Sequence, residues 1–529
     1  MSTMKKTNLI VVIILVTSMF LVSCSGGKDI SAIKGGADIS KYPVQTTEEL
    51  TYWCALPTVL SSVTDNLGNT PFSKEYEKRT GIKVHYTHPA IGQESEALNL
   101  MVASNELADM VSFSWSWYNG GVQRAIDDNI IYPINDIMAQ YAPNLTEFLK
   151  ENPEYDKMVK TDDNKYPIFP LILDGDKLTT TTGPAIRKDL LDKYGLQTPE
   201  TIEDWTNVLR TLKKNGIQIP MSFSYGNIIN LYSMFSATSL FFIDVDGKIK
   251  YGPAEPSYKE ALAGINKWYE EGLLDNNIVS VDTKMIDSYI LNGQTAATIT
   301  SGGSGIGKYM DAAKIPGFNL EGVMYPVKER GTASKYTNIV LKHLGAGVAI
   351  TTKCKNAPLA AKFLDYVYSE EGHMFANFGM DGISYNMIDG EPVYSDLIMH
   401  NPNGEPVSQI MAQYTQANNG RALIQDERYI LQYYSKPQQQ IALREWSKGA
   451  ELARTSFQLP YLNYTLEESE QYSTILNELL SYVNGISIKF FTGVEPFENY
   501  DAYLARLDKL GLKKILEIQE AAYARYKLR

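Results

Sequence analysis

Aromatic and polar side chains gather in residues 113–121, directly after a predicted buried strand. Trp115, Trp117 and Tyr118 could stack on the apolar face of a sugar ring, because indole and phenol rings pack well against such surfaces. Asn119 could hydrogen-bond the hydroxyl groups of the same ligand. In open α/β sheets, ligands bind beyond the carboxyl ends of the strands, which is where this loop is expected. The pattern therefore favours ligand binding, although the two tryptophans could instead only cap the sheet.

Two other loops combine the same residue types. Tyr225 and Asn227 occupy a comparable position in the second half of the α/β pattern. Asp381 and Tyr385 lie in a later polar and aromatic loop. We treat all four as candidate ligand contacts. The remaining tryptophans fall at core spacing within predicted helices or a predicted strand and are expected to pack: Trp53, Trp205, Trp268 and Trp446.

Residues 302–309 form a glycine-rich segment between a predicted strand and a helix. Their order fits the phosphate-binding pattern GxxxxGK, but Tyr309 stands where such a loop needs a serine or threonine hydroxyl for Mg²⁺. A nucleophile elbow is excluded as well, because Ile306 occupies the position of its second glycine. Exposed backbone N–H groups of such a turn could bind sugar hydroxyls or a uronic-acid carboxylate. Ser304 is therefore a candidate contact, and a plain turn without ligand is the equal alternative.

Metal-ligating residues are sparse. His85 and His88 stand three positions apart at the end of a predicted strand, hence on opposite faces, with no cysteine or further histidine nearby. Residues 162–164 lack the alternating acidic run and the distal glutamate of an EF-hand calcium loop, so a solvated turn is expected. We therefore expect neither a metal nor a cofactor.

The composition bounds the class of protein. The chain has 529 residues and a net charge of −12, and an acidic balance argues against a nucleic-acid partner because phosphate binding depends on lysine and arginine. At 44% hydrophobic and 21% charged residues it is typical of globular proteins, and its length exceeds the usual size of a single core. The 35 tyrosines suit amphipathic ligands such as sugars, although most of them must simply pack.

Cysteine usage gives two alternatives for the folded part of the chain. Cys54 and Cys354 could form one disulfide. Two buried free thiols are the favoured interpretation, because a long chain with its own core needs no such covalent link.

The first residues are typical of export. Two lysines precede an apolar run that ends at Leu21, and this run is shorter than the roughly 20 residues of a membrane-spanning helix. Residues 21–24 resemble the lipobox of bacterial lipoproteins, which implies removal of residues 1–23 and lipid attachment to Cys24. An ordinary signal peptide with an incidental cysteine is the alternative. Residues 24–47 are rich in glycine and polar residues, and they are predicted to be a flexible linker.

Strands and helices alternate after this linker. The first alternation implies βαβ units, and hence a parallel sheet covered on both faces. Its predicted elements are a strand at 50–56, a helix at 72–79, a strand at 82–86, a helix at 96–103 and a strand at 108–113. A second alternation contains a strand at 185–187, a helix capped by Thr201, a helix at 258–272 and a strand at 295–299. A helix is predicted at 358–372, and the chain from Ile424 onward is predicted to be almost entirely helical.

In this order the motifs resemble the family-1 extracellular solute-binding proteins of ABC sugar importers. The likeness is to the maltose-binding-protein-like group, and most of all to its large Gram-positive lipoproteins. Residues 75–84 are similar to the family's E-K-x-T-G-I-K-V motif. Residues 99–109 are similar to its L-x-L-M-x-A-S-G-x-x-P-D motif, except that Asn105 and Ala108 replace the usual glycine and proline. Weaker matches are 165–168 with 186–191, 270–275 with 293–297, and 382–386.

The resemblance implies an α/β protein with the two-lobed periplasmic-binding-protein type II fold, an interlobe hinge and a helical C-terminal region. We expect 48–172 and 326–395 in lobe 1 and 173–325 in lobe 2, with 396–529 mainly helical and largely in lobe 2. Chain crossings are expected near 169–180, near 323–332 and near residue 395.

The resemblance also implies a function. A monomeric receptor, held by lipid on the outer face of the cytoplasmic membrane, would capture a carbohydrate such as an oligosaccharide in the interlobe cleft. Closure of the lobes would present the ligand to the membrane permease of an ABC importer. An extracellular glycoside hydrolase and a receptor for a non-sugar solute such as a peptide stay open as alternatives. A structural or adhesive lipoprotein would leave the aromatic loop without a purpose.

Overall fold

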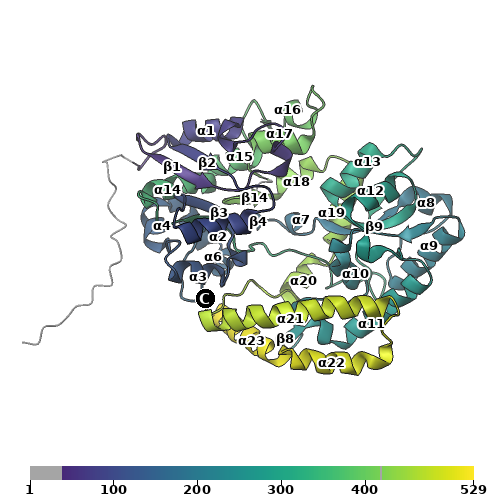
Figure 1. Cartoon of the computed structure of the whole chain (residues 1–529). Helices are drawn as coiled ribbons and strands as arrows, with labels where there is room; N and C mark the ends of the chain where they lie inside the picture. Colours follow the sequence, from purple (N-terminus) through teal and green to yellow (C-terminus); the bar gives the residue numbers. More distant parts are fainter. Residues whose placement is uncertain (1–38, 418–419) are drawn as a thin grey trace, which may run out of the picture.

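A computed structural model describes residues 39–417 and 420–529 of the chain (Figure 1). It consists of two α/β lobes, each built around its own sheet, as the sequence predicts. Among the described residues no helix is long and apolar enough to cross a membrane. The predicted signal peptide, Cys24 and the first part of the predicted linker lie outside the described residues.

The first lobe contains a six-stranded sheet in the order β14-β4-β11-β3-β1-β2. β1 pairs in parallel with β2 and β3, which confirms the predicted βαβ units, whereas β11 runs antiparallel between β3 and β4. The strands are β1 (Glu49–Trp53), β2 (Lys83–Thr87), β3 (Met110–Ser114), β4 (Phe169–Asp174), β11 (Ala346–Ile350) and β14 (Leu423–Asp426). The helices between the first three strands are α1 (Pro71–Thr80) and α2 (Glu94–Ser104).

The second lobe contains a four-stranded sheet in the order β10-β5-β9-β6. Its strands are β5 (Thr182–Arg187), β6 (Ile219–Met221), β9 (Thr295–Ser301) and β10 (Leu320–Gly322). The predicted cap of helix α9 (Ile202–Lys214) is present, since the Thr201 hydroxyl accepts from Asp204 N and Asp204 Oδ2 accepts from Thr201 N. The four tryptophans that were expected to pack are indeed buried.

Within the described residues the chain crosses between the lobes three times. It passes from β4 to β5, returns from β10 to β11, and leaves again after β14. β14 pairs in parallel with β4, so the third crossing follows Asp426 instead of lying near residue 395. Residues 424–426, expected to begin a helical region, are instead part of a strand, because they pair with β4, and all four residues of β14 are buried.

After the third crossing, α18 (Glu427–Tyr433) leads to α19 (Pro437–Trp446), which packs on the second sheet. Trp446 Nε1 donates to Pro184 O at 2.9 Å, and a Cβ at Gly183 would lie 2.5 Å from the indole ring. The predicted helix at 358–372 is divided at the turn 366–369 into α14 (Ala357–Asp365) and α15 (Glu370–Phe378).

The C-terminal helices belong to the core of the second lobe but extend beyond it. They are α21 (Leu466–Phe491), α22 (Tyr500–Lys509) and α23 (Leu512–Leu528). Val483, Phe490 and Tyr503 share one buried cluster with Trp205 of the second lobe. In Figure 1, α21 runs beneath both lobes and the C-terminus lies next to the first lobe.

Residues 39–47, the last part of the predicted flexible linker, are packed against the first lobe. Ile39 and Val44 are buried, and Tyr42 Oη donates to Lys362 O at 2.6 Å. Val44 N donates to Thr80 O at 2.7 Å. The prediction of a flexible linker is wrong for residues 39–47, because the apolar side chains of Ile39 and Val44 pack into the core of the first lobe.

The two cysteines of the folded part are free and buried, as favoured from the sequence. Burial raises the pKa of the Cys54 thiol to about 11 and raises that of Cys354 as well. Both thiols are therefore protonated at neutral pH and are poor nucleophiles.

Asp162 joins the C-terminal helix to the first lobe. Arg525 Nε lies 2.7 Å from Asp162 Oδ2, and Arg529 Nε lies 2.8 Å from Asp162 Oδ1. The Arg529 side chain is 0% exposed, and its Nη1 also donates to Lys160 O at 2.7 Å. The turn that was expected to be solvated thus receives two guanidinium groups that are far away in sequence.

We predict that Asp162→Ala lowers the free energy of unfolding by about 2 kcal/mol, because it leaves one buried and one partly buried guanidinium group without this acceptor. Chemical denaturation measures the loss, and hydrogen exchange should show earlier opening of α23. The matched control is Asp192→Ala, which removes an exposed partner of Lys188 within one helix and should cost almost nothing. Equal effects of the two substitutions would contradict the structural role of Asp162.

Candidate functional site

A cavity of about 400 Å³ lies between the lobes. The first lobe lines it with residues 116, 118 and 120–123, beyond the carboxyl end of β3. The second lobe contributes Leu240 and Phe241, and the C-terminal part contributes residues 459–464, the start of α21 and Gln519. We call this the interlobe cavity. The aromatic loop 113–121 thus lies beyond the carboxyl end of its strand, as the sequence predicts, and part of it lines this cavity.

A second cavity of about 330 Å³ adjoins it. The two share Leu240, Phe241, Leu341 and Leu459 as lining residues. The second cavity is lined mainly by the crossing segment 336–341 and by α10 (Ile228–Met234) of the second lobe, so we call it the hinge cavity. The hinge cavity therefore adjoins the chain segment that returns from the second lobe to the first.

The loop after β3 is oriented by backbone contacts. Trp115 N donates to Gly345 O at 2.9 Å, which holds the loop against the return crossing before β11. Gly120 and Gly121 adopt φ values of 87° and 73°, which disfavour any other residue. This turn directs the chain into α3 (Gly121–Asp127) and leaves Ser116 and Tyr118 on the cavity wall.

The residues predicted in this loop have different environments. Trp115 is 0% exposed and packs edge-on against Phe113, with 5.9 Å between ring centroids. Trp117 is 75% exposed. Tyr118 lines the interlobe cavity, whereas Asn119 is exposed and lines neither cavity. One tryptophan therefore supports the loop, and the other is presented to solvent beside the cavity.

The wall formed by the C-terminal part was not recognised from the sequence. Tyr464 and Tyr472 stack with 4.4 Å between ring centroids, and Gln519 Nε2 donates to Tyr472 Oη at 3.1 Å. Burial raises the pKa of Tyr461 to about 12, so its hydroxyl keeps its proton and can donate a hydrogen bond. The run Tyr461-Leu462-Asn463-Tyr464, which interrupts a helical region, was the available signal.

The other predicted contacts line neither cavity. Tyr225 and Asn227 form a short turn before α10, where Asn227 Nδ2 donates to Ile299 O at 3.2 Å. Asp381 is exposed, and Tyr385 is buried against Phe378 at the start of β12 (Tyr385–Ile388). The structure thus separates these two loops from the wall that carries Tyr118.

Ser304 is exposed within the π-helical turn Gly302–Gly307, and its Oγ lies 2.8 Å from Ser301 Oγ. The glycines are required by packing, since a Cβ at Gly302 would lie 2.4 Å from the Tyr434 ring. This turn is therefore held against the end of α18 and lines neither cavity.

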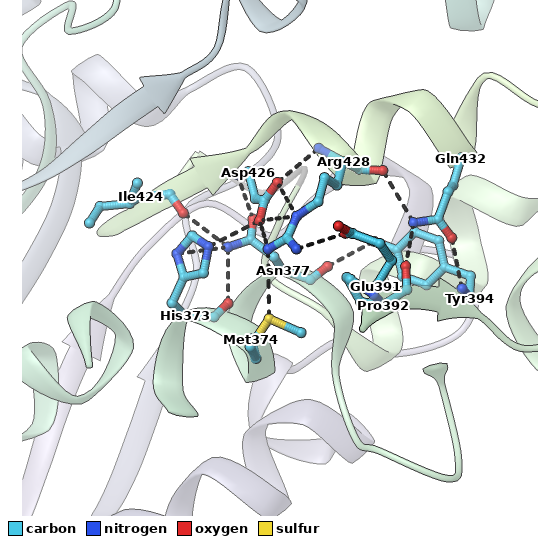
Figure 2. Close-up of polar contacts among 10 residues, drawn as sticks. All are labelled: His373, Met374, Asn377, Glu391, Pro392, Tyr394, Ile424, Asp426, Arg428 and Gln432. Atoms are coloured by element: carbon cyan, nitrogen blue, oxygen red, sulfur yellow. Dashed lines mark hydrogen bonds and ion pairs between the residues drawn. The ribbon is translucent and has the colours of Figure 1, made fainter. Parts of the chain in front are cut away.

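A polar crevice of about 730 Å³ lies at the carboxyl ends of β4 and β14. Figure 2 shows its central network, in which Asp426 lies 2.6 Å from Arg428 Nη2 and 3.1 Å from His373 Nε2. Burial opposes ionisation of Asp426, but the hydrogen bonds from His373 and Arg428 hold its pKa well below the usual range. Arg428 also bonds Glu391 at 3.0 Å. Each charged group of this network therefore has a partner within the network.

The remaining carboxylates of the crevice are bound as well. Asp174 accepts from Tyr155 Oη at 2.6 Å, and Asp176 lies 2.8 Å from Arg454 Nη2. Glu427 accepts from Lys177 Nζ at 3.2 Å. The crevice is thus a set of ion pairs and hydrogen bonds at the hinge.

Within residues 39–417 and 420–529, no group of three or more histidine, cysteine, aspartate or glutamate side chains is arranged to hold a metal ion. His88 Nδ1 lies 2.8 Å from Cys54 O, and its Nε2 accepts from Leu67 N. His85 instead contacts Glu49. The two histidines therefore have separate structural partners.

The sequence profile of the family described as bacterial extracellular solute-binding protein matches residues 68–374. The fructooligosaccharide ABC transporter substrate-binding protein FusA of Streptococcus pneumoniae is 25% identical over 490 residues, which are 85% of this chain and 86% of that protein. The polygalacturonan/rhamnogalacturonan-binding protein YtcQ of Bacillus subtilis is 23% identical over 472 residues, 86% of this chain and 88% of that protein. The solved structure of the alginate-binding protein AlgQ2 has a TM-score of 0.73 at 24% identity and covers 90% of this chain and 99% of its own.

His343 gives the hinge a pH dependence that can be measured. It is buried in the return crossing, its Nδ1 lies 2.9 Å from Leu171 O, and burial lowers its pKa to about 4. In the unfolded chain the His343 imidazole takes up a proton near pH 6.5, whereas in the folded protein it stays neutral down to about pH 4. Stability is therefore lost as the pH falls from about 6.5 toward 4. The loss attributable to His343 is at most about 3 kcal/mol over that range.

We predict that His343→Gln flattens the dependence of the unfolding free energy on pH between 7 and 4.5, as measured by chemical denaturation. His400→Gln, at a side chain that is 79% exposed, should leave the wild-type slope unchanged. Identical slopes for wild type and His343→Gln would contradict a neutral buried His343.

Proposed function

We propose that this chain, which belongs to the family of bacterial extracellular solute-binding proteins, captures a carbohydrate in the interlobe cavity and delivers it to the membrane permease of an ABC importer. One observation carries the proposal: both lobes and the C-terminal part together surround a cavity lined by aromatic rings, amides and hydroxyl groups. The chain acts as a receptor, and no bond of the ligand is made or broken.

The chemistry of the lining supports a sugar. Tyr118, Phe241 and Tyr461 offer ring faces for the C–H surface of a pyranose or furanose. Asn463 and Ser473 are neutral groups that can exchange hydrogen bonds with hydroxyls. The exposed Trp117 adds an aromatic face beside the same loop. The carbohydrates in the names of FusA and YtcQ support the same ligand class.

Three chain crossings between two lobes support a closing movement. A ligand that touches both lobes favours the closed population by its extra contacts there. The hinge cavity lies next to the ligand position, so closure would also change its shape. The closed form is the one we propose the permease recognises.

The composition of the cavity linings argues against the alternative function of a glycoside hydrolase. Such an enzyme places two carboxyl groups roughly 5–10 Å apart across the scissile bond. No aspartate or glutamate is among the described residues that line either cavity. The carboxylates of the polar crevice at the hinge are bound by cations and hydroxyl donors.

We further propose that the protein works as a monomer at the outer face of the cytoplasmic membrane, held by lipid on Cys24. Packing of residues 39–47 on the first lobe sets the point from which the remaining linker must reach the membrane. A soluble receptor tethered in this way stays beside its permease, which raises their effective concentration.

The proposal is tested by calorimetric titration of the whole mature chain with mono- and oligosaccharides and with peptides. Trp117→Ala should weaken sugar binding roughly three- to tenfold, the value of one aromatic contact, without changing the melting temperature. Trp115→Ala should instead lower the unfolding free energy by about 3–5 kcal/mol, because it empties a buried site. Unchanged affinity in Trp117→Ala would remove this residue from the site.

The titration also separates the alternatives. Recovery of intact sugar after binding supports a receptor, whereas cleaved sugar would replace it with a hydrolase. If heat is exchanged with peptides but with no sugar, the ligand is a peptide and the proposal of a carbohydrate ligand is wrong.

Cys24→Ser should release the protein from the membrane fraction into the medium while leaving ligand affinity unchanged. Fractionation and immunoblotting of the producing cells measure the distribution, and titration of the released protein measures affinity. Retention of the variant in the membrane fraction would contradict anchoring through Cys24.

A further inference from the structure

We infer that the ligand of the interlobe cavity is an uncharged oligosaccharide, not one built from uronic acids. The inference rests on the proposed function and specifies its substrate. FusA is named for fructooligosaccharides and YtcQ for polygalacturonan and rhamnogalacturonan, so the names of the relatives include a neutral sugar and an acidic one. The choice for this chain must come from its own side chains.

The linings of both cavities are free of charge. Among the described residues that form them, none is aspartate, glutamate, lysine, arginine or histidine. Their polar side chains are hydroxyls and amides, such as those of Gln123 and Asn463 in the interlobe cavity and Asn338 in the hinge cavity. A carboxylate taken from water into such a site has no cation to compensate its lost hydration, and that loss is large. Sugar hydroxyls carry no such penalty once they are hydrogen-bonded.

The cations behind the interlobe wall are already bound to carboxylates. Arg525 contacts Asp162 at 2.7 Å and Glu468 at 2.5 Å, and its Nη2 donates to Asn463 O at 3.3 Å. Arg529 shares the same aspartate. Their charges are thus neutralised one layer away from the ligand, where they fix the backbone of a lining residue.

The cations near the hinge cavity also lie next to carboxylates or aromatic rings. Arg454 lies 2.8 Å from Asp176 and 3.3 Å from Glu451. Its Nε and Nη2 have no hydrogen-bond partner among the described residues, but the residue lines neither cavity. The Lys335 ammonium lies 5.4 Å from the ring centroids of Tyr336 and Phe457, in cation–π contact. Arg421 lies against Cys54 in the first lobe and lines neither cavity.

Gln519 provides a specific reason for a hydroxyl ligand. The residue is 2% exposed and lines the interlobe cavity, and its Nε2 is occupied by Tyr472 Oη. Its Oε1 has no hydrogen-bond partner among the described residues. A buried amide oxygen needs a donor. A sugar hydroxyl can donate to it, whereas a carboxylate would place a second acceptor against it.

The dimensions favour more than one sugar ring. Two adjoining cavities of about 400 and 330 Å³ share one apolar boundary, and each lies within the usual range of small-molecule sites. An oligosaccharide can extend from the aromatic loop toward the hinge, with Leu341 and Leu459 between the two compartments.

The experiment is calorimetric titration of the full mature chain with length-matched neutral and acidic oligosaccharides: fructo-, galacto- and gluco-oligosaccharides against oligogalacturonates and alginate oligosaccharides. We expect a neutral series to bind and every acidic one to bind roughly a hundredfold more weakly or not at all. The affinity should change less than about twofold between 50 and 500 mM NaCl, because no ion pair forms with the ligand.

Gln519→Leu should weaken the neutral ligand about fivefold through loss of one acceptor. Thermal melting of the variant measures separately what loss of the hydrogen bond to Tyr472 does to the fold. Gln471→Leu, on α21 but outside both linings, is the matched control and should bind as the wild type does.

The outcomes distinguish this inference from the proposed function. Tight, salt-dependent binding of an acidic oligosaccharide overturns neutrality and leaves a carbohydrate receptor standing. Binding of neutral monosaccharides alone overturns the oligomeric ligand. Absence of binding to any carbohydrate overturns the proposed function itself, and the inference with it.

Discussion

The ionic contact between Asp162 and the C-terminal arginines is the interaction on which one wall of the interlobe cavity depends. The C-terminal helices share their core with the second lobe, yet Arg525 and Arg529 dock on a turn of the first lobe. Between these two attachments lie Tyr461 to Tyr464, the start of α21 and Gln519, which together close the interlobe cavity. The wall is thus attached to both lobes.

The two tryptophans of the loop after β3, Trp115 and Trp117, differ in burial and therefore in role. A fully buried indole at Trp115 stabilises the turn, and its neighbour two positions on remains free to meet a ligand. The arrangement follows from the short helical turn at 115–117, which points successive large side chains in different directions. A rigid support under an exposed aromatic ring reduces the entropy that binding would otherwise cost.

Among the described residues, charged side chains are absent from the linings of both cavities and are concentrated at the hinge and behind the cavity walls. The network around Asp426 in Figure 2 and the pair of Arg454 with Asp176 connect the strands and helices that carry the crossings. Paired charges there connect the crossing segments to one another. The polar groups of the two linings are hydroxyls and amides, and they lie beside aromatic rings.

The sequence by itself determined the two α/β lobes, the βαβ units of the first sheet, the cap at Thr201 and the family, because these depend on local periodicity, capping chemistry and the order of short motifs. It also placed the aromatic loop beyond β3, where Tyr118 lines the cavity. Only the tertiary structure decided that β14 returns to the first sheet, that residues 39–47 are packed, and that Tyr464, Tyr472 and Gln519 form the opposite wall. It likewise set Tyr225, Ser304 and Tyr385 apart from that wall. The physical reason is distance along the chain: a helical pattern specifies which face is buried, but the partner of that face is chosen by contacts between residues that are hundreds of positions apart, as Asp162 and Arg529 are.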